Sequence, residues 1–430
     1  MAPLDRWTRL SRLSVDATFR QSQASMHSSL PSATLPVIIS DLETAVISDP
    51  AAFEGLAEDW GMLFDRCLEP SPFQSFTWNQ VTWRHCSEGA SLAVITVREK
   101  GRLVGVGPFV TRRRLGVEHI YPIGFDQFAY LGPLVLQGRD DVAQAIATAF
   151  ADRFPRGLLH IPYFQCRDEG LAVMLARLST LGWNSCSWAR NVCHYLCESE
   201  GYEKFLATKS SKARYNLKRE RKKLEEAGAV EIRLCQGAEI DEHVVERVAA
   251  IQKRSWLFRR GQEPLGSPYY RELLPALGRL HLADVYLMTH GGKDVAFVLN
   301  YHSGRENICS CVGFDEALAQ LSPGKVMMNS VVQTILDRGD HVLDFLFGDA
   351  EYKQFWANRS RFAMELVAWK GVPAHVCSWF PARLRAWVKR HPKTTGALKS
   401  VRRWLHRLFN PVSHGGSNIV PPPVAGKDEA

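Results

Sequence analysis

The sequence predicts a mixed α/β fold whose strands form largely antiparallel meanders. One observation is that segments with strand periodicity alternate with segments of helical periodicity along most of the 430 residues. Another is that one order of elements occurs twice: helices, a meander of strands, then alternating helix and strand. No G-x-G-x-x-G follows a strand and no G-x-x-x-x-G-K-[ST] occurs, which argues against a dinucleotide fold and a P-loop. We therefore expect two related α/β domains.

In the first half, prolines and glycines separate the predicted elements. Pro50, Pro70 and Pro72 bound the first helices, and Gly101 fits a hairpin turn. We expect helices over 50–69 and 76–87, strands over 92–97, 103–110, 117–121 and 130–136, a helix over 141–153, a strand over 158–161, a helix over 169–181 and a strand over 183–196.

The second half repeats this order. Gly291 and Gly292 predict a tight hairpin, and Gly339 suits the position after a helix end. We expect a basic helix over 211–227, a strand over 230–234, helices over 241–258 and 268–278, strands over 281–289, 294–301 and 307–313, a helix over 324–338, and strands over 342–347 and 362–370.

The positive charge of the chain is concentrated near its C-terminal end. Residues 373–410 hold nine of the 53 Lys and Arg and no Asp or Glu, which leaves 44 basic against 45 acidic residues elsewhere. A general nucleic-acid-binding surface is therefore not indicated. No apolar run reaches the roughly 18 residues of a membrane span. The ten cysteines and fourteen histidines show no metal-ligand spacing, so we expect no metal. No continuous apolar run of the kind found in secretory signals follows Arg6, Arg9 and Arg12, so we expect reduced thiols and a cytoplasmic protein.

A turn in the second half has the features of an anion site. Ser322, Pro323, Gly324 and Lys325 lie between a strand and a helix. Free amides and the helix dipole favour anions at such a junction, and Lys325 adds a full positive charge. The turn is also compatible with an ordinary helix start capped by Ser322.

The segment 344–356 is the most informative stretch for chemistry. A buried strand carries Asp344, Gly348 ends it, and Asp349, Tyr352 and Lys353 follow. Asp344 or Asp349 could accept a proton, Tyr352 could donate to a leaving thiolate, and Lys353 could neutralise a phosphate or a developing oxyanion. A capping Asp, a core Tyr and a solvated Lys would give the same pattern.

Several blocks together resemble the CelD/FemAB-like branch of the GNAT acyltransferase superfamily. The blocks are residues 210–219, 252–256, 295–297, 322–324 and 344–353, with looser matches at 71–75, 78 and 105–109. The resemblance implies tandem GNAT-like domains. It also implies acyl-CoA, such as acetyl-CoA, as donor, with its diphosphate at residues 322–325. The acceptor would be an amine or hydroxyl of a sugar, amino acid or cell-envelope precursor, near Trp256, Asp344, Tyr352 and Lys353. The phosphate loop of the wider superfamily is reduced here to Ser-Pro-Gly-Lys.

The basic helix 211–227 leaves a second donor open. Lys212 and Arg214 could bind a phosphorylated acceptor, or tRNA, because FemAB relatives use aminoacyl-tRNA. A third reading is a non-enzymatic scaffold apposed to a membrane.

The pattern of residues 383–409 predicts amphipathic basic helices with Trp387 and Trp404, which would suit an anionic membrane surface or a helix docked on the protein. A peripheral position at the inner face of the membrane follows from the first option. We expect a disordered leader over 1–35, a degenerate GNAT-like domain over 36–195, a GNAT acyltransferase domain over 196–372, a basic helical tail over 373–410 and a disordered end over 411–430.

Overall fold

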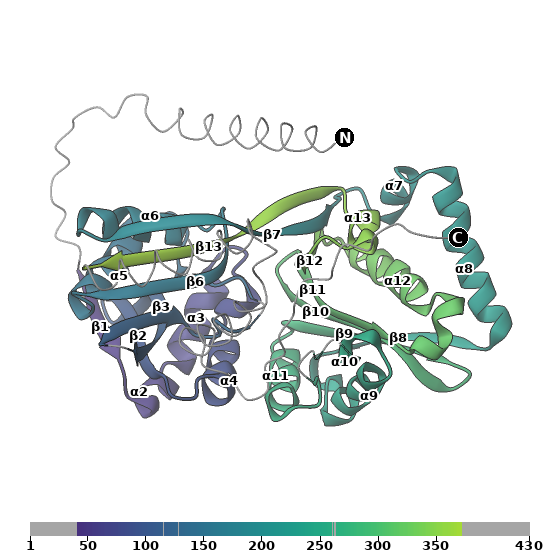
Figure 1. The fold of residues 1–430 in the computed structure, drawn as a ribbon, viewed down its shortest axis with the longest axis horizontal. Helices are drawn as coiled ribbons and strands as arrows, with labels where there is room; N and C mark the ends of the chain where they lie inside the picture. Colours follow the sequence, from purple (N-terminus) through teal and green to yellow (C-terminus); the bar gives the residue numbers. More distant parts are fainter. Residues whose placement is uncertain (1–40, 115, 128, 260, 262–263, 372–430) are drawn as a thin grey trace, which may run out of the picture. The chain divides into compact units, whose positions relative to one another are not determined.

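One mixed sheet runs through the described part of the chain (Figure 1). The computed structural model describes residues 41–371, apart from 115, 128, 260, 262 and 263. The expected leader over 1–35 and the segments 373–410 and 411–430 therefore lie outside the described residues. The strands are β1 (Leu42–Ile47), β2 (Ser91–Glu99), β3 (Arg102–Arg114), β4 (Val117–Pro122), β5 (Leu134–Val135), β6 (Gly157–Gln165), β7 (Asn184–Cys197), β8 (Val230–Gln236), β9 (Ala283–His290), β10 (Lys293–Ser303), β11 (Glu306–Phe314), β12 (Val342–Phe347) and β13 (Arg359–Lys370).

The strand order is β1-β2-β3-β4-β6-β13-β7-β12-β11-β10-β9-β8, with β5 paired to β3. Pairing is antiparallel except between β4 and β6 and between β11 and β12. The predicted mixed α/β class and the meanders are therefore confirmed.

Helices connect these strands at the positions that the sequence predicts for the most part. They are α2 (Pro50–Glu54), α3 (Ala57–Arg66), α4 (Phe76–Cys86), α5 (Asp140–Arg153), α6 (Glu169–Thr180), α7 (Tyr202–Ala207), α8 (Ser211–Ala227), α9 (Glu242–Lys253), α10 (Trp256–Arg259), α11 (Pro268–Arg279), α12 (Pro323–Asp337) and α13 (Glu351–Trp356), with short 3-10 helices η1 (Pro72–Gln74), η2 (Gly237–Glu239) and η3 (Glu316–Leu321). Gly291 and Gly292 both have positive φ, as a tight hairpin requires, and Gly339 has φ 87° just beyond α12.

Two long strands in the middle of the sheet join the two halves of the chain. β7 pairs with β13 over most of its length and with β12 near its C-terminal end. β13, the last described strand, pairs on its other side with β6 of the first half. Strands from both halves thus alternate at the centre of one sheet.

Helices cover both faces of the second-half strands (Figure 1). α9, α10 and α11 pack on one face, and α12 packs on the other with α7 and α8 against it. α8 is capped by Ser210, whose hydroxyl accepts a hydrogen bond from the amide of Ala213. It buries only Leu217 and Leu224, so most of its basic surface faces solvent.

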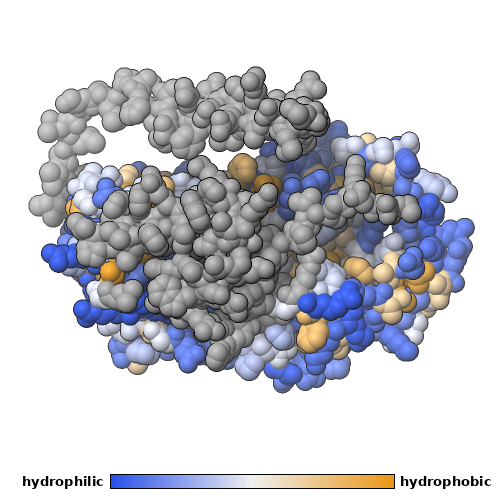
Figure 2. All heavy atoms as spheres, viewed as in Figure 1, coloured by the Kyte–Doolittle hydropathy of each residue, from blue (hydrophilic) through white to orange (hydrophobic). Residues whose placement is uncertain are grey.

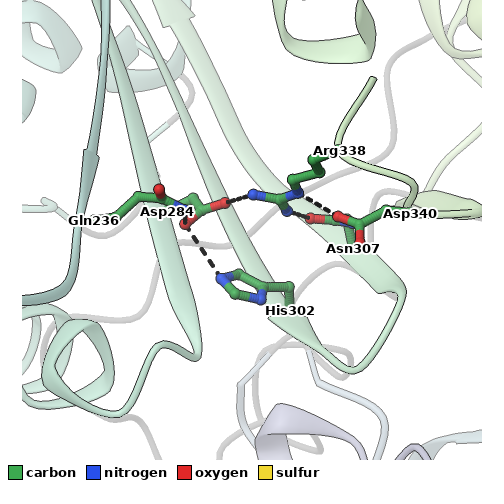
Figure 3. Close-up of polar contacts among 6 residues, drawn as sticks. All are labelled: Gln236, Asp284, His302, Asn307, Arg338 and Asp340. Carbon is green, nitrogen blue, oxygen red and sulfur yellow. Dashed lines mark hydrogen bonds and ion pairs between the residues drawn. The ribbon is translucent and has the colours of Figure 1, made fainter. Parts of the chain in front are cut away.

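A buried polar network fixes the C-terminal end of α12 to the sheet (Figure 3). Asp284 is fully buried and accepts hydrogen bonds from Arg338 at 2.7 Å and from Gln236 at 2.8 Å. His302 Nε2 lies 3.2 Å from the same carboxylate. The guanidinium of Arg338 also bonds Asn307 and Asp340. This network holds the helix whose N-terminal end carries the predicted donor turn.

On the face drawn in Figure 2, the described surface is mostly hydrophilic, and apolar residues occur in small groups. Within the described residues, no helix has both the length and the apolar character that crossing a membrane requires.

Candidate active site and its position in the fold

The site region begins where β11 and β12 stop pairing. Their parallel pairing covers only three residue pairs, ending at Ile308 and Asp344. A register shift between β10 and β11 leaves Ser310 without an opposite residue, as in a β-bulge. As a result, Cys309 packs with the core on the α12 face and Cys311 with the core on the opposite face. The two strands part at the level where the predicted catalytic segment follows.

The carboxylate of Asp344 is buried and accepts three hydrogen bonds. Its Oδ2 accepts the hydroxyl of Tyr130 at 2.8 Å and a guanidinium N–H of Arg361. Its Oδ1 accepts the amide of Leu346 at 2.8 Å. Leu346 has φ 52° at a register shift between β12 and β7, a conformation that is strained for a residue with a side chain. The contacts of Asp344 therefore suit a positioning residue that holds this bulge.

Lys353 lies directly beyond β12. Its ammonium donates to the carbonyl of Phe347 at 2.7 Å. Burial lowers the pKa of Lys353, and the nearby ionisable groups of Cys309 and Asp344 oppose that shift only in part. A lysine in such a place has N–H groups left for an anionic oxygen.

Tyr352 lies beside Lys353 on α13 and is 40% exposed. Burial of its hydroxyl raises its pKa, and the thiols of Cys309 and Cys311 act in the same direction. Burial likewise raises the pKa of Cys309 to about 12, so this thiol is protonated at neutral pH. The structure thus brings Tyr352, Lys353 and Asp344 to one region, with thiols that are poor nucleophiles.

Asp349 takes part in a different contact. Its Oδ1 lies 2.8 Å from Nε2 of His194, which is the main reason for the lowered pKa of Asp349. Gln354 donates to the same oxygen. The side chain of Asp349 is 64% exposed, so it lies outside the buried cluster around Asp344.

The donor turn is already contacted by an acidic side chain. Ser322 adopts φ 54°, and its carbonyl accepts the amides of Lys325 and Val326. Ser322 also hydrogen-bonds Glu220 of α8, and the charge of Lys325 acts on the same carboxylate. The pKa of Glu220 is lowered mainly by its hydrogen bond with Arg219, and Ser322 and Lys325 lower it further. The carboxylate of Glu220 is therefore the anion that this helix start contacts in the structure.

Gly324 has a packing reason, because a Cβ there would lie 2.8 Å from the ring of Phe314. Pro323 has no N–H and is buried at the first turn of α12. The four residues form a helix start in which few amides remain free, and their role with a donor diphosphate stays a prediction.

The predicted acceptor residues lie on two faces of the sheet. Trp256 belongs to α10 and packs with the core on the α9–α11 face. Lys212 and Arg214 lie on α8, on the opposite face. Arg214 donates to the carbonyl of Lys209 at 2.6 Å, beyond the end of α7, whereas Lys212 is exposed. The structure does not bring Trp256 together with the two basic residues.

Five further residues contact the predicted site segments but carry no sequence motif that predicts this role. They are Tyr130, Tyr163, Arg361, His194 and Glu220. Tyr130 and Tyr163 both contact the ring of Phe347, at centroid distances of 5.4 and 4.2 Å. Except for Arg361, these residues are separated from their partners by long stretches of sequence, and no local motif marks any of them. Within the described residues, no cluster of His, Cys, Asp and Glu could hold a metal ion.

Residues 211–354 match the family model described as "Acetyltransferase (GNAT) domain". This segment is therefore similar to GNAT acetyltransferase domains. The match begins with α8 and ends within α13, so it includes the turn before α12 and the whole of segment 344–353, and it supports transferase activity.

Known structures share the fold over a longer part of the chain than residues 211–354. The crystal structure of FemX is 10% identical with a TM-score of 0.55, over 75% of this chain and 96% of that chain. At this identity the likeness concerns the fold, and its extent agrees with a tandem GNAT-like architecture.

Two further structures are similar over comparable lengths. The C-terminal domain of a putative lysylphosphatidylglycerol synthetase from Agrobacterium fabrum is 10% identical, with TM-score 0.48, over 78% of this chain and 97% of that chain. A tandem GNAT protein from the clavulanic acid biosynthesis pathway is 12% identical, with TM-score 0.41, over 76% of this chain and 98% of that chain. No curated protein sequence matches the chain.

Proposed function

We propose that this protein is an acyltransferase of the CelD/FemAB-like branch that moves an acyl group from acyl-CoA to an amine or hydroxyl. The acceptor is a small molecule or glycan precursor of the cell envelope or of a polysaccharide, or an amino-acid-like compound. The observation that carries this proposal is Lys353, whose amine lies at the end of β12, next to the place where β11 and β12 part.

The chemistry we propose is direct attack of the acceptor on the thioester. The acyl carbon gains the bond to the acceptor nitrogen or oxygen as its bond to sulfur breaks, and the acceptor's proton leaves to solvent or to the departing thiolate. Lys353 stabilises the oxyanion that develops on the thioester carbonyl. Tyr352 donates a hydrogen bond to the leaving sulfur. Asp344, which already accepts three hydrogen bonds, keeps the strand and its bulge in place.

A covalent acyl-cysteine intermediate is not part of this proposal. The three buried thiols nearest the region belong to Cys193, Cys309 and Cys311, and burial raises the pKa of each. Thiols of this kind are largely protonated at neutral pH and attack thioesters slowly. Positioning of donor and acceptor then supplies much of the rate.

The donor site we propose at residues 322–325 requires Glu220 to release Ser322. A carboxylate beside a helix start repels a diphosphate, and Lys325 would then pair with the diphosphate instead. Because the contact between Glu220 and Ser322 opposes diphosphate binding at this turn, a second candidate function stays open, that of an aminoacyl-tRNA-dependent transferase. That reading is favoured by the exposed cations of α8, among them Lys212 and Lys218.

Calorimetric titration separates the two donors. We expect acetyl-CoA to bind the full chain, and Lys325→Glu to weaken binding at least tenfold while Lys222→Glu, an exposed charge change on α8, leaves it unchanged. If the intact protein binds no acetyl-CoA but binds tRNA with a steep salt dependence that Lys212→Gln and Lys218→Gln reduce, the tRNA-dependent reading replaces the first.

A further inference from the structure

A pocket far from the proposed active site is lined mainly by cationic side chains. Its volume is about 480 Å³, and it lies between the β3–β4 hairpin, the C-terminal end of α5, the start of β6 and the end of β13. The charged residues that line it are Arg113, Glu118, Arg153, Arg156 and Lys370. Four cationic groups from four separate elements therefore face one carboxylate.

The cations of this pocket are poorly neutralised by the protein. Arg153 lies 3.6 Å from Glu118, a long contact between partly exposed groups. Within the described part of the chain, Arg113 and Arg156 form neither an ion pair nor a side-chain hydrogen bond. Lys370 donates to the carbonyl of Leu181 at 2.8 Å and keeps its other N–H groups. The pocket therefore attracts an anion.

The pocket is separate from the acyl-transfer region. β13 runs from Arg359, opposite Tyr195 on β7, to Lys370 at the pocket. Tyr195 in turn lies opposite Asp344. Twelve residues of strand span about 35 Å, so an anion in the pocket is too distant to present its reacting group to Lys353.

The shape and surroundings of the pocket favour a phosphate headgroup over a nucleic acid. Arginine guanidinium groups match phosphate oxygens in pairs. No aromatic side chain lines the pocket, whereas proteins that bind single-stranded nucleic acid stack bases on aromatic rings. Trp369 and Val367 lie next to Lys370 as partly buried residues on a small apolar cluster. A cationic pocket beside an amphipathic tryptophan is typical of a membrane interface.

The charge of the following chain has the same sign. β13 ends at Lys370, and residues 373–410 then add nine Lys or Arg and no acidic residue. We infer that the pocket formed by Arg113, Arg153, Arg156 and Lys370 binds the phosphate headgroup of an anionic lipid and docks this end of the molecule on a membrane surface. The inference concerns a site formed mainly by the first half, with Lys370 of β13, and holds whichever donor the second half uses.

Vesicle sedimentation with the full chain tests this inference. Vesicles of phosphatidylcholine with phosphatidylglycerol are compared with vesicles of phosphatidylcholine alone, for wild type and for Arg113→Gln/Arg156→Gln. Each basic residue near an anionic surface contributes on the order of 1 kcal/mol, so we expect roughly 30-fold weaker partitioning of the double variant at low salt. Both arginines are exposed, and an unchanged melting temperature will show that the variant is folded.

A matched control and two further ligands complete the test. Arg66→Gln/Arg102→Gln removes the same charge from exposed positions outside the pocket and should change partitioning less than threefold. Soluble short-chain phosphatidylglycerol, below its micelle concentration, should bind wild type and not the pocket variant, which separates the pocket from the basic tail.

Three results overturn the inference. The first is equal vesicle binding by wild type and the pocket variant. The second is binding of inorganic phosphate at the pocket without binding of the short-chain lipid. The third is loss of tRNA binding in the pocket variant while its lipid binding stays intact.

Discussion

Lys353 lies in the proposed active site, and the burial of its charged amine lowers the stability of the fold. Its amine has one carbonyl partner, and burial lowers its pKa. We expect Lys353→Met to lower the rate of acyl transfer at least about 100-fold, because the oxyanion loses its stabilising charge. The same change should raise the free energy of unfolding at pH 7 by about 1 kcal/mol, since replacing a poorly solvated charge by an apolar side chain is often stabilising.

The pH dependence of this gain has a definite sign. The pKa of Lys353 is lower in the folded protein than in the unfolded chain. At pH values between these two pKa values the unfolded chain binds more protons, so the stability of the wild type rises with pH in this range. The advantage of the methionine variant is therefore largest below the folded pKa and shrinks as the pH approaches about 10.4. Urea unfolding at pH 7 and pH 10 measures it, with Lys353→Arg as control. A methionine variant less stable than wild type at pH 7 would mean that the contacts of the amine outweigh its burial.

Single residues were predictable only where local sequence marks them. Asp344 and Lys353 were expected in the site because Gly348 ends a buried strand between them. Their partners could not be found in this way, since Tyr130 lies 214 residues from Asp344. Glu220 was read only as part of a basic helix, yet it contacts the donor turn across a stretch of about a hundred residues. Long-range pairing depends on packing, which periodicity does not encode.

At the scale of elements, periodicity predicted helices well and irregular segments poorly. The basic helix expected over 211–227 is α8 with the same bounds. The strand expected over 130–136 is reduced to Leu134–Val135, and the edge strand Leu42–Ile47 was not predicted. The helix expected over 241–258 is divided, because the chain turns at Arg254 and Ser255 between α9 and α10. Edge strands and helix breaks carry weak patterns, since only part of their surface is buried.

The anchor of α12 leads to a prediction about acid stability. Burial acts to raise the pKa of Asp284, but hydrogen bonds from His302 and then from Gln236 and Arg338 lower it to about 2. A depressed carboxylate pKa stabilises the fold above the ordinary value of 3.8, and this contribution is lost as the pH falls from about 4 towards 2. We expect Asp284→Asn to lower the free energy of unfolding at pH 7 by about 3 kcal/mol, because Arg338 loses its buried partner.

Urea unfolding between pH 7 and pH 3 checks this prediction. The loss caused by Asp284→Asn should become smaller towards pH 3, because the carboxyl of Asp284 takes up a proton there in the unfolded chain while it stays largely ionised in the folded protein. Asp337→Asn removes an exposed carboxylate of the same helix and should change stability by less than about 0.5 kcal/mol. A difference between wild type and Asp284→Asn that stays constant over this range would contradict the assigned pKa.

At the scale of the whole molecule, the repeated order of elements predicted a tandem fold but not how its halves share strands. β13 of the second half lies between β6 and β7, and β7 reaches across to β12. Such exchange involves pairs far apart in sequence, so local patterns do not specify it. The domain limits of 36–195 and 196–372 remain a proposal, and the strand β7 spans the limit between them.

This shared sheet predicts that the second half depends on the first. A fragment of residues 196–372 would leave β12 without β7 and β13 without either neighbour, and Asp344 would lose the hydroxyl of Tyr130. Unpaired strand edges promote aggregation, and the loss of one hydrogen bond to a buried carboxylate lowers stability. We expect this fragment to be insoluble or to unfold without a cooperative transition, whereas residues 42–371 give a single sharp transition on heating. Circular dichroism and proton NMR dispersion of both fragments distinguish the cases. A well-dispersed spectrum and a sharp melting transition for 196–372 would show that this fragment folds on its own, and that the strands of the first half add to a core already complete.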